Sequence, residues 1–125
     1  MRRTRYRQGI DRGQATVELA LAMPLLCLLL LGIVQIAVVV RDQIVAIEAA
    51  RVGARAAAVS ADPATAAEVA VQRGVSLSTR VSTVTNDGYV TVTVAIINLT
   101  DVPLIGVLMP NVELRGSATM ILEPP

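Results

Sequence analysis

The sequence predicts an α+β protein anchored in a membrane, in which a long N-terminal transmembrane helix continues outward and packs on a small three-stranded antiparallel sheet. Three observations predict this fold. Residues 19–40 are apolar and uncharged, residues 41–59 favour helix, and three later runs alternate apolar and polar side chains. We therefore divide the chain into a basic cytoplasmic leader (1–13), a long helix (14–59) and a small exported α+β domain (60–125).

The apolar run, LALAMPLLCLLLLGIVQIAVVV, is long enough to cross a bilayer. At 1.5 Å per residue it spans about 33 Å, against roughly 30 Å for the hydrocarbon core. One alternative is a buried helix of a soluble protein, but so small a chain cannot surround such a helix on all sides. A removable signal peptide is the other, and its apolar region is usually shorter. We expect a permanent anchor spanning residues 19–40.

The charges predict the orientation of this anchor. All eleven basic residues of the 125-residue chain are arginines, and those at positions 2, 3, 5, 7 and 12 precede the apolar run. Arginines flanking a span remain in the cytoplasm, so the part after Arg41 should be exported. The same stretch could be interpreted as a nucleic-acid-binding arm, but a topology signal explains it better beside a spanning helix. We expect no nucleic-acid partner.

Within the span, Pro24 removes one backbone donor and predicts a kink about one turn earlier, near Ala20. Gly32 and Gln35 are residues of the small and polar kinds that can mediate contacts between membrane helices, although we prefer the simpler interpretation of Gln35 as a single tolerated polar residue. Cys27 is the only cysteine, so no intramolecular disulfide can form.

Beyond the membrane, residues 41–59 contain no proline, and apolar side chains recur at helical spacing, so the helix should run from about Gln14 to Val59. Asp62 and Pro63 suit the cap and first turn of a second, short helix that extends to Arg73. Gly74 can close that helix.

Three strands are predicted after the helices. Residues 80–86 and 89–97 flank Asn86-Asp87-Gly88, a strong hairpin signal because the Asp-Gly pair supplies positive φ angles. A third strand covers residues 112–123, where Gly116 can mark a bulge. Between the second and third strands, residues 98–110 predict a short helix or turn on the sheet or at the membrane surface. They begin with Asn98-Leu99-Thr100, a glycosylation sequence of the kind that arises by chance.

One carboxylate, Glu18, stands at the edge of the span, in the stretch RGQATVELALAMP. There it can still reach headgroups and water, whereas deeper in the bilayer its desolvation would be costly unless it were paired. A simpler interpretation is a first-turn residue that the helix dipole favours, worth under about 1 kcal/mol.

The chain resembles the TadE-like family of the tight-adherence (Flp-type) pilus systems, a branch of the type IV pilus machinery. The resemblance runs through RGQATVELALAMPLLCLLLLGIVQIA, EAARVGARAAA and the closing VELRGSATMILEP. It implies a pseudopilin with a basic leader, one membrane helix and a small exported domain. It also implies cleavage by a prepilin peptidase after a glycine that precedes a segment with glutamate at its fifth position.

On this resemblance Gly13 is the glycine, Gln14 the new first residue and Glu18 the glutamate; Leu19 stands where the family often has an aromatic residue. Cleavage would expose an ammonium at Gln14, which could pair with Glu18 of a neighbouring subunit and set the register of assembly. The implied partners are the membrane, the prepilin peptidase, other pilin-like subunits and an inner-membrane assembly platform.

Two other functions remain open at this stage. An unprocessed single-pass anchor carrying a small exported interaction domain would differ in lacking cleavage after Gly13. An enzyme has no support from the sequence, because there is no histidine, Cys27 lies in the apolar run and the carboxylates are scattered. We expect no catalytic residues, cofactor, metal or small-molecule substrate.

Overall fold

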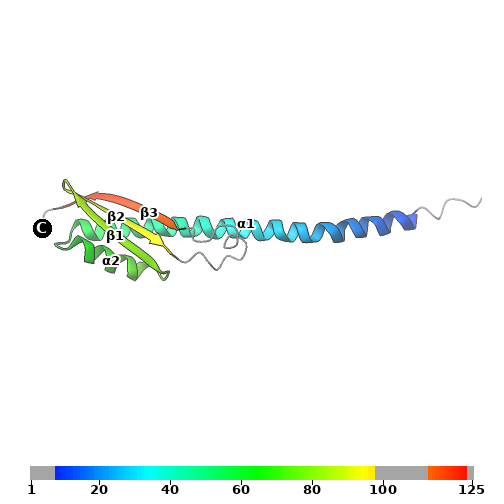
Figure 1. Cartoon of the computed structure of the whole chain (residues 1–125), viewed down its shortest axis with the longest axis horizontal. Coiled ribbons are helices and arrows are strands. Elements are labelled where there is room, and N and C mark those ends of the chain that lie inside the picture. Colours follow the sequence, from blue (N-terminus) through cyan, green and yellow to red (C-terminus); the bar gives the residue numbers. More distant parts are fainter. Residues whose placement is uncertain (1–7, 98–112, 124–125) are drawn as a thin grey trace, which may run out of the picture. The chain divides into compact units, whose positions relative to one another are not determined.

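The computed structural model describes residues 8–97 and 113–123, with the backbone alone for residues 8–12. It contains helices α1 (Gln8–Ala58) and α2 (Pro63–Gly74) and strands β1 (Thr79–Asn86), β2 (Tyr89–Ile96) and β3 (Leu114–Ile121) (Figure 1). The predicted α+β fold is confirmed. The chain forms two compact units, Met1–Val34 and Gln35–Pro125, which are described separately.

The first unit contains the N-terminal part of α1, whose apolar side chains are exposed. The most apolar 18-residue window of the helix has a mean hydropathy of 2.7, and only 6% of that window is buried. A core helix of a soluble protein would be mostly buried, so the exposure argues against that alternative. By length and composition, α1 is the one helix in the described ranges that can cross a membrane.

Helix α1 begins at Gln8, and not near Gln14 as predicted. Gly9 and Gly13 are the two glycines at this end, and each costs about 1 kcal/mol, which is too little to interrupt a helix that continues to Ala58. Pro24 lies inside α1, which is helical on both sides of it. A bend at Pro24 stays a prediction.

The second unit is built on a face of small side chains on the C-terminal part of α1. Ala46, Ala50, Ala54 and Ala57 are fully buried, whereas Ile44 and Val52 are more than half exposed. Small residues allow a helix to lie close to a sheet. Ala50, Ala54 and Ala57 pack with α2 and β2 in a core that also contains Ala67, Val71, Val90, Val92 and Val94.

The sheet has the order β1-β2-β3, and both pairings are antiparallel. In the central strand, Val90, Val92, Val94 and Ile96 are fully buried, which confirms the predicted apolar face. The β1–β2 turn is the predicted hairpin. Asp87 and Gly88 have φ angles of 48° and 77°, the left-handed conformation that such a two-residue turn requires.

Strand β3 pairs with β2 without interruption, and Gly116 lies directly opposite Val94, so the predicted bulge is wrong. Gly116 instead allows α1 to approach. A Cβ atom at this position would lie 2.3 Å from the carbonyl carbon and oxygen of Ala46. The strand therefore crosses the helix at backbone contact, which requires a residue with no side chain.

Helix α2 begins as predicted, with Asp62 as its cap. The Asp62 carboxylate accepts hydrogen bonds from the backbone N–H of Thr65 (3.3 Å) and from its hydroxyl (2.6 Å). The other end differs from the prediction. Gly74 is the last helical residue and lacks a positive φ, and the cap is the extended residue Val75, whose N–H donates to the Val71 carbonyl oxygen at 3.0 Å.

Candidate functional site

The predicted processing segment lies on the surface of α1. Gly13, Gln14 and Glu18 are all exposed, and a Cβ atom at position 13 would meet nothing within 4 Å. Gln14 and Glu18 are four residues apart, so they occupy the same face of the helix about 6 Å apart along its axis. Nothing in the described chain obstructs access to this segment.

The Gly13–Gln14 peptide bond lies within α1, after its sixth residue. The backbone groups there are engaged in helical hydrogen bonding, so a protease that binds extended backbone has to unwind the first turns before it can cut. Gly13 lowers the cost of this unwinding, because glycine is the least stable ordinary residue in a helix interior, apart from proline.

Gln35 is the polar residue in the apolar run, and it is only 5% exposed, whereas Val34 and Ile36 beside it are mostly exposed. Its Nε2 atom has no hydrogen-bond partner in the part of the chain that the structure describes. The predicted contact of Gly32 and Gln35 with another membrane helix stays a prediction.

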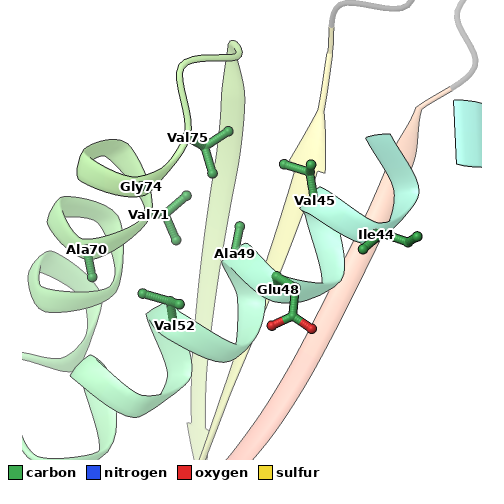
Figure 2. A pocket seen from close by; sticks show the side chains of 9 residues that line it. All are labelled: Ile44, Val45, Glu48, Ala49, Val52, Ala70, Val71, Gly74 and Val75. Atoms are coloured by element: carbon green, nitrogen blue, oxygen red, sulfur yellow. The ribbon is translucent and has the colours of Figure 1, made fainter. Parts of the chain in front are cut away.

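A groove of about 260 Å³ lies between α1 and α2 (Figure 2). It is mostly apolar. From α1 it is lined by Ile44, Val45, Glu48, Ala49 and Val52, and from the end of α2 and the residue after it by Ala70, Val71, Gly74 and Val75. Its volume suits one or two aliphatic side chains.

Glu48 is the charged residue of the groove, and its carboxylate pairs with the Arg51 guanidinium at 2.7 Å, one turn along α1. Both side chains are about 60% exposed, so water screens the interaction and it contributes little to stability. The groove provides an apolar contact surface and no arrangement for chemistry.

On the outer face of the sheet, Glu113 links two arginines from the two edge strands. Its carboxylate accepts from Nε (3.1 Å) and Nη2 of Arg115, and it lies 3.7 Å from Nη1 of Arg80. The hydrogen bond from Arg115, with the positive charges of Arg115 and Arg80, holds the pKa of Glu113 below its ordinary value. Arg80 and Arg115 lie on the two edge strands, and each is paired with Ala95 of the central strand β2. The side chain of Ala95 is small, so the Glu113 carboxylate can extend across β2 toward Arg80.

The middle of the outer face carries hydroxyl groups that pair with one another. Thr91 and Thr119 share a hydrogen bond of 2.8 Å, and Thr93 donates to Ser117 at 3.3 Å. Among the described residues, no group of three or more His, Cys, Asp or Glu side chains converges to hold a metal ion. The expectation that the chain is not an enzyme stays a prediction.

Sequence reasoning missed the groove and the Arg80–Glu113–Arg115 cluster. Because side chains alternate along a strand, the sequence from Val112 to Glu123 puts Glu113 and Arg115 on one face, so two of the three residues of the cluster can be recognised from the sequence. Arg80 joins them only through the pairing of both strands with β2, and that register cannot be deduced from the composition of either edge strand.

The family model of TadE-like proteins matches residues 13–55. This match confirms the resemblance over residues 13–55, and it begins at Gly13, the residue before the predicted cleavage point. No curated protein and no solved structure matches the chain.

Proposed function

We propose that this chain, whose residues 13–55 match the TadE-like protein family, is a pseudopilin-like component of tight-adherence (Flp-type) pilus assembly. The family match suggests involvement in Tad pilus assembly, and the exposed apolar part of α1 is suited to a single-pass membrane anchor. In the proposal the N-terminus is cytoplasmic and the C-terminal domain is exported. The chain then works through contacts with other pilin-like subunits and an inner-membrane platform.

The first step of the proposed mechanism is hydrolysis of the Gly13–Gln14 bond by a prepilin peptidase. Water adds across the bond, leaving a carboxylate on the leader and an ammonium on Gln14. The leader carries away five arginines, which removes the charges that hold the N-terminus at the cytoplasmic surface. The exposure of Gly13 and Gln14 supports access to the bond.

The second step is a charge pair between the new ammonium and Glu18. Because Gln14 and Glu18 are one helical turn apart, the carboxylate of each chain lies close to the ammonium of the same chain as well as to that of a neighbour. A pair between neighbours satisfies both groups only when two helices are aligned within about one turn. We therefore propose that Glu18 measures the axial register of adjacent subunits.

The observation that carries this proposal is the family match beginning at Gly13, in front of an exposed helix with glutamate at the fifth position after the glycine. The test is the intact mass and N-terminal sequence of the protein isolated from its native membrane. A chain beginning at Gln14 is expected. A chain that keeps the arginine-rich leader, in cells with an active prepilin peptidase, would instead support an unprocessed single-pass anchor.

A further inference from the structure

One end of the sheet of the second unit lies beside Gln43 of α1. Near this end, Nε2 of Gln43 donates to the Arg115 carbonyl oxygen at 2.9 Å. At the other end, the Glu123 N–H donates to the Ala58 carbonyl oxygen at 2.9 Å. Strand β3 therefore runs in the same direction as α1, and its first residues lie beside the part of α1 that directly follows the apolar run.

The distance from the bilayer follows from helix geometry. Gln43 comes three residues after Val40, the last residue of the apolar run, so the two are about 4.5 Å apart along the helix axis. The headgroup layer on each side of a bilayer is about 5–7 Å thick. If the apolar run fills the hydrocarbon core, Gln43 and Arg115 lie at the level of the headgroups.

The side chains at this end combine positive charge with exposed aliphatic surface. We call Arg41, Leu77, Arg80, Ile97 and Arg115 the membrane-proximal rim. The side chains of Arg80 and Arg115 are 71% and 67% exposed, and Leu77 and Ile97 are 37% and 46% exposed. A hydrogen bond of 3.1 Å from the Ile97 N–H to the Ser78 carbonyl oxygen fixes the backbone beside both aliphatic residues.

From this placement we propose that the membrane-proximal rim docks on the bilayer surface, with its arginines binding the phosphates of anionic phospholipids. Arginine matches phosphate geometry with a planar fork of donors, and its aliphatic stem lies comfortably at the edge of the hydrocarbon. Leu77 and Ile97 enter the boundary between headgroups and acyl chains. Basic and aliphatic residues together are typical of surfaces that bind in the plane of a membrane.

Among the residues that the structure describes, Glu113 and Asp42 are the acids near this end of the domain, and their positions are compatible with docking. The Glu113 carboxylate engages Nε and Nη2 of Arg115 and lies beside Nη1 of Arg80, while each guanidinium carries five N–H donors. The acid therefore fixes the direction of both arginines and leaves donors for phosphate. Asp42 is only 9% exposed, so the protein covers most of its side chain.

This proposal rests on the membrane anchor of the proposed function and is independent of cleavage after Gly13. Docking would hold the domain against the bilayer before assembly. The rim would then have to dissociate from the lipids before the domain could leave the membrane surface. Loss of docking and loss of cleavage are therefore separable results.

The test uses the full chain, with Cys27→Ala, in lipid nanodiscs made of phosphatidylcholine alone or mixed with phosphatidylglycerol. A fluorophore is attached through Ser78→Cys in the rim or through Asn86→Cys at the far end of β1, about 26 Å away at 3.3 Å per residue. Lipids with a nitroxide on the headgroup quench a fluorophore that lies at the surface. Membrane insertion is verified separately by resistance to alkaline extraction.

We expect phosphatidylglycerol to raise quenching at position 78 at least about twofold, and to leave position 86 unchanged, because anionic headgroups attract arginines near the surface. The double variant R80Q/R115Q should abolish this rise. The matched control R51Q/R55Q, which removes two arginines from α1 about 16 to 22 Å beyond Val40, should retain it. Equal quenching with both lipids, or a rise that survives R80Q/R115Q, would overturn the proposal.

Discussion

Gly116 of β3 contacts the backbone of Ala46 in α1 at a distance that excludes any side chain at position 116. A Cβ atom there would lie 2.3 Å from the Ala46 carbonyl carbon and oxygen and 2.5 Å from the Ile47 nitrogen. These are backbone atoms of a helix, and they cannot move aside as the tip of a side chain can. The contact therefore determines how closely the sheet and the helix approach.

Replacing Gly116 by alanine should destabilise the second unit by about 3 kcal/mol or more, because the strand has to move away from α1 and open the core between them. Thermal unfolding of the full chain in a neutral detergent measures this loss. Gly74→Ala is the matched control. A Cβ at position 74 meets nothing within 4 Å, so this variant should be unchanged or slightly more stable. Equal stability of the two variants would contradict the contact.

Gly88→Ala should destabilise the hairpin by about 1–2 kcal/mol, because position 88 has a φ of 77° and side chains are strained in the left-handed region. The destabilisation is not caused by a steric clash, because a Cβ atom at position 88 would meet nothing within 4 Å. Hydrogen exchange at the β1 and β2 amides should accelerate in this variant. Unchanged protection of both strands would show that the turn conformation is not needed for pairing.

The stability of the domain should fall in acid partly through Asp62. The hydroxyl and N–H of Thr65 donate to its carboxylate and hold its pKa below the ordinary 3.8. Because the folded pKa is the lower one, the contribution is complete above about pH 4 and is lost as pH falls through the folded value. Asp62→Asn keeps a capping group that does not titrate, so its melting temperature should decline less in that range. Identical pH profiles would refute this role.

Gly13→Ala should slow cleavage by about fivefold, because alanine stabilises the helix around the scissile bond by up to about 1 kcal/mol. The ratio of processed to unprocessed chain, followed over time with the peptidase present, gives the rate. Gly32→Ala makes the same change in α1 far from the bond, also without a contact within 4 Å. A similar rate for both variants would mean that unwinding at Gly13 does not limit cleavage.

Glu18→Gln should insert into the membrane and be cleaved, yet fail to assemble with its partner subunits. The amide keeps the size of the side chain and removes the charge that would pair with the Gln14 ammonium. Crosslinking between tagged subunits in native membranes detects the assembly. Full crosslinking in the variant would leave Glu18 with no role beyond its favourable position near the helix start.

Patterns within one segment were predictable, whereas contacts between segments were not. The Asp87-Gly88 turn, the apolar face of β2 and the Asp62 cap each depend on a few neighbouring residues, and the sequence contains that information. The role of Gly116 depends on α1, seventy residues earlier, and so glycine in a strand was taken for a bulge. The start of α1 was also placed too late, near Gln14, whereas the helix begins at Gln8.

The same separation between Ala46 and Gly116 constrains the order of folding. The hairpin of β1 and β2 is local and can form early, but the close contact with the helix needs a strand that leaves the ribosome much later. Until β3 is synthesised, β2 lacks one of its two neighbouring strands, so its valines are less completely buried. Glu113 and Arg115 of the Arg80–Glu113–Arg115 cluster are also missing until then. A chain exported while still being made would therefore cross the membrane with its domain open, and would complete folding only on the far side.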